Sequence, residues 1–339
     1  MLTPNEQDNL VVWDPSASRG HVESYFMKAN DPASRRAFWL KFTLFARPGQ
    51  ASAAVGDVWA IFFNADTHEH VALRNQFPAR ECTLGRDHVE VKMGASEFHT
   101  GRSVGDLKLD DQSIKWDLTF DTSGAPFHHF PSEKLYKGRF PKSKALSPYP
   151  DSSFTGTITV NGEKVAIDGW PGMQGHNWGE QHTPRYAWGH CNLFDGNPED
   201  TFFEGFTGRI LVGGVMIPPV TRTFLRYKGT DYPLLSAKGT LWPPATIRYD
   251  QWDFQSEGQG YVLEGSLKAD KRDMVGLYYK NPEGPNTDCL NSKLARCDLR
   301  LFETNGRKRT LVTELHSAHG AALEVAIHEG ESHGVRMTV

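Results

Sequence analysis

Cysteine is scarce in this chain of 339 residues, and the four cysteines lie far apart in the sequence. They are Cys82, Cys191, Cys289 and Cys297, and their spacing contains no Cys-x-x-Cys element of the kind that forms a zinc knuckle. Thiols stay reduced in the cytosol, and a chain of this length can build its core without disulfides. We therefore expect reduced thiols in the core of a cytoplasmic protein.

Long apolar runs and a strong charge of one sign are also missing. No apolar run approaches ~18 residues, the approximate length that a helix needs to cross a bilayer. Residues 1–8 are polar and acidic, without the charged and then apolar layout of a signal peptide. The net charge is -4, with mixed signs and no basic stripe among aromatic residues. These absences predict a cytoplasmic location and no nucleic-acid partner.

Motifs for common cofactors and nucleophiles are absent as well. No Gly-rich loop follows a strand and opens a helix, because Gly213-Gly214 lies inside a run of β character. There is no Gly-x-Ser-x-Gly elbow. His176, His182 and His190 do not have the compact spacing of metal ligands. We expect neither a cofactor nor a metal.

Short aromatic runs separated by turn residues are abundant. Aromatic residues make up 12% of the chain, which also has 32 glycines and 20 prolines, and the mean hydropathy is -0.51. Many short strands between turn signals predict an all-β sandwich or barrel. The best helix candidate is residues 31–38, which would form a turn or two at most.

The two halves of the chain are weakly similar, because each begins with an aromatic strand, at residues 23–26 and 186–190. We predict two antiparallel β-barrel domains in tandem, residues 1–150 and 151–339, joined near residues 140–165, where the Pro-rich segment 140–150 fits a crossover. The clearest hairpin contains Asn161-Gly162, which suits a type I′ turn. A barrel of about eight strands is either filled by side chains or holds one small ligand.

Residues 169–180, in the predicted second domain, combine glycines with two indoles and several polar groups. Glycines let a backbone bend sharply or approach another group closely. A plain turn needs no indole, and a core strand does not need His, Asn and Glu together. The mixture predicts a cavity wall, with flat apolar faces for a ligand and a few placed polar groups.

This segment also resembles a known superfamily. The residues that carry the resemblance are Trp170-Pro171-Gly172-Met173-Gln174-Gly175-His176-Asn177-Trp178-Gly179, the alternation from Tyr186 to Phe194, and residues 23–30 and 37–39. They are similar to the double-lipocalin superfamily of hydroxyneurosporene synthases (carotenoid 1,2-hydratases) and AttH-like proteins, with tocopherol cyclases as more distant relatives. The resemblance implies two lipocalin-like barrels and proton-driven hydration or cyclisation of an isoprenoid. Some related lipocalin-like proteins promote cycloadditions.

The chain departs from the hydratase pattern at one position. The corresponding hydratase motif is similar to Asp-His-Asn-Trp-Gly, in which the Asp is a candidate proton donor. This chain has Gly175 in place of that Asp. Either the acid comes from elsewhere in the chain or the chemistry is different.

Protonation of an alkene needs an acid beside aromatic faces that attract a cation. Glu180 would share a face with Trp178 if the strand extends that far, or it is a surface residue at the start of a loop. His176 and Asn177 either act as acid, base or ligand anchor, or hydrogen-bond the loop backbone where the two domains meet.

A second set of candidates follows from the alternation at residues 186–194, where large and small side chains take turns. The large face is either a cavity wall, which Trp178 would share, or an exposed aromatic ladder. Glu204 lies between Phe202 and Phe206 on one predicted face. It is a cavity acid, a salt-bridge partner that lines a pocket, or part of an outward face with exposed Phe. The candidate catalytic residues are His176, Glu180, His190 and Glu204, and the candidate substrate-binding residues are Glu23, Tyr25, Asn177, Trp178, Tyr186, Trp188 and Asn192.

The favoured hypothesis is a cofactor-independent hydratase, cyclase or isomerase of a hydrophobic isoprenoid, polyene or polyketide-like molecule. It would work by confinement with acid or hydrogen-bond catalysis. The alternative is a non-catalytic carrier of a lipid or pigment, which Gly175 favours. A third hypothesis is a structural protein without a small ligand. The expected partner is a hydrophobic small molecule, with peripheral access to a membrane as a further option for a lipid substrate.

Overall fold

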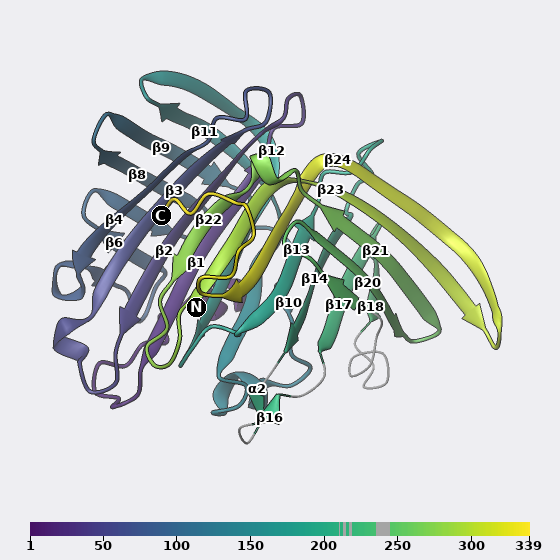
Figure 1. Cartoon of the computed structure of the whole chain (residues 1–339), viewed down its shortest axis with the longest axis horizontal. Coiled ribbons are helices and arrows are strands. Elements are labelled where there is room, and N and C mark those ends of the chain that lie inside the picture. Colours follow the sequence, from purple (N-terminus) through teal and green to yellow (C-terminus); the bar gives the residue numbers. More distant parts are fainter. Residues whose placement is uncertain (210, 213–214, 217–218, 235–244) are drawn as a thin grey trace. The chain divides into compact units, whose positions relative to one another are not determined.

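The structure is a computed structural model of the chain, and it describes all residues except 210, 213–214, 217–218 and 235–244. Gly213 and Gly214, which the sequence assigns to a β-run, lie outside the described residues. The described part is almost entirely antiparallel β-sheet (Figure 1). Its only α-helices are α1 (Pro4–Asp8) and α2 (Glu133–Lys137), which confirms the all-β prediction.

The chain forms two compact units. Unit 1 comprises Met1–His182, Lys280–Asn286 and Val339, and unit 2 comprises Thr183–Tyr279 and Thr287–Thr338. Each unit contains one large antiparallel sheet that curls on itself (Figure 1). No helix among the described residues is long and apolar enough to cross a membrane.

The sheet of unit 1 has the strand order β4-β3-β2-β1-β12-β11-β9-β8-β7-β6-β5, and β10 pairs with β11. The order places β1 directly beside β12, so that residues 163–179 close on the first strand of the chain. The strands are β1 (His21–Asn30), β2 (Arg36–Ala46), β3 (Val55–Asn64), β4 (Val71–Pro78), β5 (Thr83–Leu84), β6 (Glu90–Met93), β7 (Ser96–His99), β8 (Arg102–Leu109), β9 (Gln112–Phe120), β10 (Phe127–His128), β11 (Ser143–Val160) and β12 (Glu163–Gly179).

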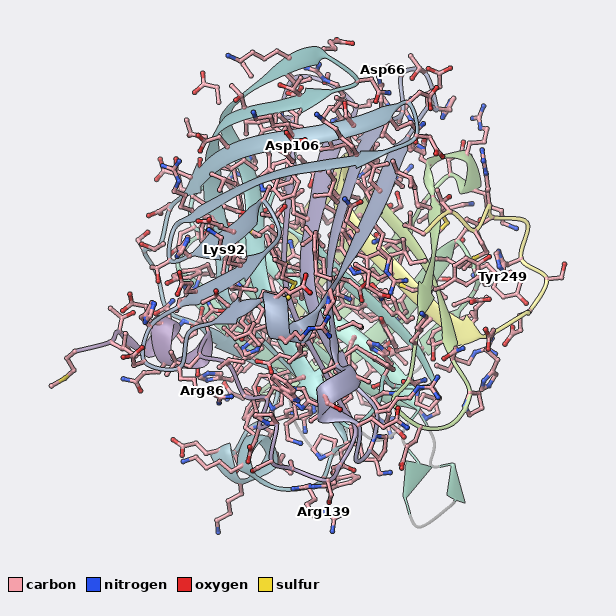
Figure 2. All side chains as sticks on the ribbon, turned by 90° about the vertical axis from the view of Figure 1, so that its left-hand side faces the viewer. Asp66, Arg86, Lys92, Asp106, Arg139 and Tyr249 are labelled. Carbon is pink, nitrogen blue, oxygen red and sulfur yellow. The ribbon has the colours of Figure 1, made fainter. Side chains whose placement is uncertain are left out.

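Sequence patterns explain the local structure of unit 1. In β9 every second residue is buried, which is the period of a strand with one face on the core. The hairpin between β11 and β12 turns at Asn161 and Gly162, which have φ angles of 49° and 87°. Positive φ at both central positions is the type I′ geometry, so the predicted hairpin is confirmed. The core of this unit includes Tyr25, Phe98 and Trp116, while Asp66, Arg86 and Lys92 are exposed (Figure 2).

The sheet of unit 2 has the strand order β18-β17-β14-β13-β24-β23-β21-β20-β19, with β22 paired to β23. A small separate pair is formed by β15 (Leu211–Val212) and β16 (Val215–Met216). The strands of the large sheet are β13 (Arg185–Cys191), β14 (Phe202–Arg209), β17 (Val220–Tyr227), β18 (Thr230–Leu234), β19 (Ala245–Ile247), β20 (Gln251–Gly258), β21 (Tyr261–Lys268), β22 (Val275–Tyr279), β23 (Thr287–Asn305) and β24 (Lys308–His328).

Small residues of β13 face the core of unit 2. Ala187 and Cys191 belong to this core, together with Phe203, Trp252 and Leu323. The alternation therefore points Tyr186, Trp188 and His190 to the opposite face of the sheet, as the sequence predicted. None of the four cysteines forms a disulfide, and Cys82 is the one that is not fully buried.

Two expectations about the division of the chain need correction. The boundary at residues 150/151 falls inside β11, and the compact units divide after His182. The segment 169–179 therefore belongs to the first unit, not to the second. The physical reason is the pairing of β12 with β1, which runs from Val22 opposite Gly179 to Ala29 opposite Gly172. Strand pairing across a long stretch of sequence outweighs the local Pro-rich signal.

The expected helix at residues 31–38 is wrong. The Asp31 side chain accepts hydrogen bonds from the Ala33 backbone, the Ser34 hydroxyl and the Arg36 guanidinium. These bonds hold a turn, and β2 begins at Arg36 and pairs with β1 and β3. An Asp side chain that bonds the backbone two residues onward competes with helix formation in this way.

Candidate functional site

The first candidate cluster lies in unit 1, on the face of the sheet that carries the core. The antiparallel register places Tyr25 opposite His176 and Glu23 opposite Trp178. The His176 ring stacks on Tyr25 with 4.3 Å between ring centroids and lies 4.8 Å from the Trp178 ring. Four candidates that are far apart in the sequence, Glu23, Tyr25, His176 and Trp178, are thus brought together.

Glu23 is the centre of this cluster, with a side chain that is 0% exposed. Five groups hydrogen-bond its carboxylate: the backbone N–H groups of Val12 and Trp13, each at 2.8 Å, the His21 and His176 rings at 2.8 and 3.0 Å, and the Tyr25 hydroxyl at 2.8 Å. Burial opposes ionisation, but the bonds from His176 and His21 outweigh it and hold the pKa of Glu23 well below its ordinary value. Glu23 is therefore a carboxylate.

The contacts of His176 determine its proton count. Its Nδ1 lies 2.6 Å from the backbone oxygen of Asp8, and its Nε2 lies 3.0 Å from Oε1 of Glu23. Both partners are acceptors, whereas a neutral imidazole has only one N–H. Because Glu23 is ionised, His176 must carry two protons, and the two residues form a buried imidazolium–carboxylate pair.

The segment before β1 completes the cluster. Asn9 and Gln174 exchange side-chain hydrogen bonds of 2.8 and 3.1 Å, and Asp8 pairs with His128 at 2.7 Å. Both ring nitrogens of His176 are thus engaged by protein, one of them by this segment. A ligand could reach His176 only if the segment moved, so the arrangement favours a role for the cluster in holding the fold together.

Gly175 is covered by an aromatic ring. Phe26 lies opposite Gly175 in the register, and a Cβ added to Gly175 would lie 2.3 Å from Cζ of Phe26. The place that an Asp would occupy at this position is therefore taken by the Phe26 ring. The structure gives a steric reason for the departure from the hydratase pattern.

We expect Gly175→Ala to destabilise the protein by about 1–3 kcal/mol, since inserting a methyl group into packed space forces neighbours to shift. In the background of Phe26→Ala, where the ring is absent, the same change should have little effect. Urea unfolding of the parent protein, the two single variants and the double variant measures the coupling. Equal destabilisation in both backgrounds would contradict the steric explanation.

Glu180 does not meet the condition of a buried acid. β12 ends at Gly179, so Glu180 lies beyond the strand and does not share a face with Trp178 through strand alternation. Its side chain is 23% exposed and pairs with Arg19 at 2.8 Å. Of the two alternatives for Glu180, the structure agrees with a surface residue at the start of a loop, because the strand stops one residue too early. Asn177 is half-buried and lies opposite Ser24, on the other face of β12 from His176.

The second candidate cluster lies on the face of the unit 2 sheet opposite the core, and we call it the Trp188 face. One row across neighbouring strands contains Asn291, Glu324, Trp188 and Phe206. The next row contains Ala322, His190, Glu204 and Phe224. His190 and Glu204 lie opposite each other in the register of β13 and β14, and both are buried. The structure thus brings Tyr186, Trp188, His190 and Glu204 together on one face, although Asn192 lies just beyond the end of β13.

Glu204 lies among aromatic rings. Its Oε1 accepts a hydrogen bond of 3.1 Å from the indole N–H of Trp188. Ring centroids are 6.4 Å apart between Trp188 and His190, 6.4 Å between His190 and Phe202, and 5.4 Å between Phe202 and Phe224. A buried carboxyl beside a continuous row of ring faces is the arrangement that can deliver a proton and stabilise the cation that results.

Lys293, Asn291 and Glu324 belong to the same face, and the sequence analysis missed them. Nζ of Lys293 donates to Oε1 of Glu324 at 2.8 Å and to Oδ1 of Asn291 at 2.6 Å, and lies 5.5 Å from the Trp188 ring. Burial lowers the pKa of Lys293, and the Glu324 carboxylate offsets part of this effect. Burial also raises the pKa of Tyr186, and nearby Cys289 and Glu324 add to the rise. Glu324 is the single charge in the otherwise apolar run 320–327, and this was the available signal.

Trp178 and Trp188 lie in different sheets. The predicted wall shared by Trp178 and Trp188 presumed a single domain of residues 151–339, and the division of the chain after His182 removes that basis. Among the described residues, no group of three or more His, Cys, Asp or Glu is arranged to hold a metal ion.

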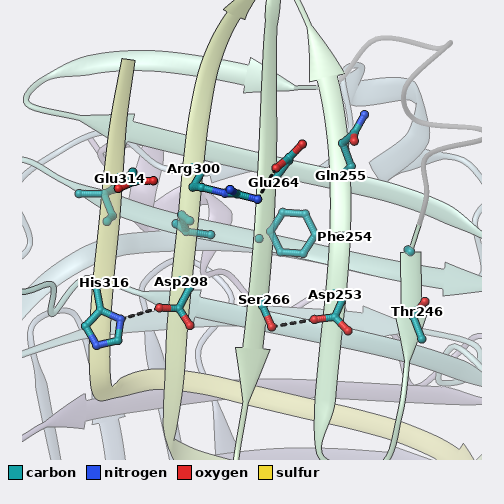
Figure 3. Close-up of a pocket in the computed structure, with 14 residues that line it drawn as sticks. Thr246, Asp253, Phe254, Gln255, Glu264, Ser266, Asp298, Arg300, Glu314 and His316 are labelled. Carbon is teal, nitrogen blue, oxygen red and sulfur yellow. Dashed lines mark hydrogen bonds and ion pairs between the residues drawn. The ribbon is translucent and has the colours of Figure 1, made fainter. Parts of the chain in front are cut away.

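A groove of about 670 Å³ lies elsewhere in unit 2, and none of the predicted site residues lines it. Figure 3 shows polar side chains from neighbouring strands in this groove, among them the hydrogen-bonded pairs His316–Asp298 at 2.6 Å and Ser266–Asp253 at 2.7 Å. Glu264 pairs with Arg300 at 2.8 Å. Glu264, Arg300, Asp298 and His316 of the groove are thus paired among themselves, which is typical of a solvated sheet surface rather than of a site for an apolar ligand.

The chain is similar to uncharacterised proteins of Mycobacterium tuberculosis strains CDC 1551 / Oshkosh and ATCC 25618 / H37Rv. Each is 25% identical over 328 residues, which cover 95% of this chain and 92% of the relative. A crystal structure of a protein described as an AttH from Nitrosomonas europaea superposes with a TM-score of 0.53 at 13% identity, over 94% of this chain and 93% of that chain. This likeness shows a shared fold of two lipocalin-like barrels.

The family match covers one candidate cluster completely and the other only in part. The profile of the tocopherol cyclase-like family matches residues 149–327. This range includes every member of the Trp188 face named above, together with His176 and Trp178, but not Glu23 or Tyr25. Because the match extends over more than half of the 339 residues, the chain belongs to the tocopherol cyclase-like family.

Proposed function

We propose that the protein is a cofactor-independent hydratase, cyclase or isomerase of a hydrophobic isoprenoid, polyene or polyketide-like molecule, and that the Trp188 face is its site. The observation that carries the proposal is the buried Glu204 carboxyl, hydrogen-bonded to the Trp188 indole beside the row of rings formed by His190, Phe202 and Phe224. Membership of the tocopherol cyclase-like family supports the same class of reaction.

Glu204 takes the role of proton donor in this proposal. In its protonated form it delivers a proton to one carbon of a double bond, and the positive charge develops on the neighbouring carbon. The rings of Trp188 and Phe202 face that charge and attract it. A water molecule or a hydroxyl of the same substrate then adds to the cation and returns a proton to the Glu204 carboxylate. The first case is a hydration, the second a cyclisation, and direct proton loss from carbon is an isomerisation.

Confinement supplies the remainder of the rate enhancement. A flexible chain held in one folded conformer reacts as if its ends were at a very high effective concentration, which lowers the barrier by several kcal/mol without a strong acid. His190, buried beside Glu204, and Tyr186 are placed to orient the substrate or the attacking oxygen. His176 and Glu23 act in this proposal by fixing the fold of unit 1.

A carrier without catalytic activity is the second candidate, and Gly175 favours it. Gly175 stands where the hydratase pattern has an Asp, and the ring of Phe26 fills the space that an Asp side chain would occupy. A carrier relies on apolar burial and needs few polar groups. The concentration of Glu204, Lys293 and Glu324 on one face favours the enzyme instead.

The test compares Glu204→Gln with Glu180→Gln. A carotenoid, a prenylated hydroquinone and a linear polyene ketone serve as probes, with products analysed by mass: hydration adds one water, whereas cyclisation and isomerisation change only the retention time. We expect Glu204→Gln to lower turnover by ~10²-fold or more, the usual range for a lost general acid, with binding almost unchanged. Glu180→Gln should behave like the parent protein.

Equal turnover of the two variants would remove Glu204 from the proposal. If the parent protein binds a probe but forms no product from any of the three probes, the carrier is favoured. Trp188→Ala should then weaken probe binding.

A further inference from the structure

We infer that Asn291 binds a neutral oxygen atom of the substrate, so that the ligand of the Trp188 face is an oxygenated amphiphile and not a pure hydrocarbon. The inference rests on the proposed site and deepens it, because it assigns a specificity-determining residue and a class of substrate. It follows from four features of unit 2: the orientation of one amide, the burial of its donor, the neighbouring ion pair, and the spacing of the strands.

The orientation of the Asn291 amide is determined by Lys293. Nζ of Lys293 lies 2.6 Å from Oδ1 of Asn291. An ammonium group can only donate, so the atom that faces it must be the amide oxygen. The NH₂ group of Asn291 therefore points away from Lys293 as a donor of two hydrogen bonds.

Within the described part of the chain, the donor has no protein acceptor. Asn291 is fully buried, and among the described residues its Nδ2 has no hydrogen-bond partner. A buried donor without an acceptor costs about 1–3 kcal/mol, so folded proteins keep such groups rarely and chiefly where a ligand or an ordered water satisfies them. The amide thus presents an unsatisfied donor on the same face as Trp188.

The neighbouring charges determine which oxygen fits. Lys293 and Glu324 form an ion pair with N···O at 2.8 Å, and the Lys293 side chain is 0% exposed. The positive charge is already matched, and a second anion beside Glu324 would be repelled at low dielectric. A carbonyl, ether or hydroxyl oxygen can accept from the amide without adding charge. A carboxylate should therefore bind poorly.

The strand order sets the length of the ligand. Asn291, Glu324, Trp188 and Phe206 lie in one row across β23, β24, β13 and β14, and Glu204 lies on β14 two residues before Phe206. Neighbouring strands are about 4.8 Å apart and residues rise about 3.3 Å along a strand, so three strand spacings and two residues separate the backbone positions of Asn291 and Glu204 by roughly 16 Å. A substrate that contacts both side chains carries its oxygen at one end and its reactive double bond toward the other, over a comparable length. A C15 isoprenoid chain is long enough.

The experiment compares three probes that share the farnesyl chain: farnesal with a carbonyl oxygen, farnesoic acid with a carboxylate, and farnesene without oxygen. Quenching of tryptophan fluorescence at neutral pH gives the three affinities. We expect farnesal to bind most tightly. Asn291→Leu should weaken farnesal binding by about tenfold, the size of one hydrogen bond, and leave farnesene within about twofold.

Asn291→Asp is the second variant, because it keeps an acceptor for Lys293 and replaces only the NH₂ group. It should also lose the preference for farnesal over farnesene, which a merely structural role of Asn291 would not alter. Thermal unfolding of each variant establishes that it is folded. Equal affinity of the parent protein for farnesal and farnesene, or an equal loss for both probes in a folded Asn291→Leu variant, would overturn the inference.

The outcome is separable from that of the proposed function. If Glu204→Gln loses turnover while the Asn291 variants keep the farnesal preference, the assignment of Asn291 as the oxygen-binding residue is wrong and that of Glu204 as proton donor is supported. If the Asn291 variants lose the preference while Glu204→Gln retains full turnover, the assignment of Asn291 is supported and that of Glu204 as proton donor is wrong.

Discussion

Glu23→Ala is expected to destabilise the protein by about 3–5 kcal/mol, the range for breaking a buried ion pair by removal of one partner. The change leaves the His176 imidazolium without its counter-ion and the N–H groups of Val12 and Trp13 without their acceptor. The His176 ring is buried and the two N–H groups are partly buried, so each donor then bears a desolvation penalty in proportion to its burial. Urea unfolding followed by tryptophan fluorescence measures the loss.

Glu180→Ala is the matched control. Its partner Arg19 is 53% exposed, and exposed ion pairs contribute about 0–1 kcal/mol. If the two alanine variants are equally stable, the Glu23 cluster does not hold the N-terminal segment to the sheet.

The same cluster predicts how stability depends on pH. The pKa of Glu23 in the folded protein lies below its ordinary value, which in an unfolded chain is about 4.3. The unfolded state therefore binds the proton first as the pH falls. The stability that Glu23 contributes is fully present above about pH 4.3 and is lost as the pH falls toward the folded pKa. Glu23→Gln should show a smaller loss of stability between about pH 5 and pH 3, and an unchanged slope would contradict the assignment.

Lys293→Met is expected to destabilise the protein by a similar amount, about 3–5 kcal/mol. Methionine fills most of the volume of the lysine, so the loss reflects charge rather than packing. Glu324 would remain buried without its counter-ion, and Oδ1 of Asn291 would lose its donor. The measurement is again the free energy of unfolding in urea.

The double variant Lys293→Met/Glu324→Leu separates charge from other effects. Replacing a whole buried ion pair by apolar groups is often neutral or stabilising, so the double variant should recover most of the stability that the single variant loses. Arg296→Met on the same strand is the control, because its pair with Asp298 is 59% and 41% exposed. If the double variant is less stable than Lys293→Met, the two changes do not act through a shared ion pair.

Local features of the fold could be predicted from local sequence. Asn161 and Gly162 adopt the positive φ angles of their turn because few other residues tolerate them. The alternation of Ala187 and Cys191 with Trp188 and His190 was enough to assign the faces of β13, because side chains alternate along every strand. The strand stretches and the resemblance of residues 170–194 to the superfamily were likewise visible without coordinates.

The sites depended on strand order. Glu23 and His176 are distant in sequence, and the local sequence around either residue does not predict contact with the other. They meet because β12 pairs with β1 in one particular register. A shift of one residue would turn every side chain to the opposite face. Asn291 and Lys293 meet Trp188 in the same way, since β24 lies between β23 and β13.

The sequence by itself thus determined the class of fold, the turns and the side-chain alternation, because these depend on interactions between near neighbours in the chain. The tertiary structure decided that residues 169–179 belong to the first unit, that Phe26 fills the space above Gly175, and that Glu204 lies beside Trp188. Each of these depends on which distant strands pair, and that pairing is set by the burial of whole sheet faces, a property that no short segment carries.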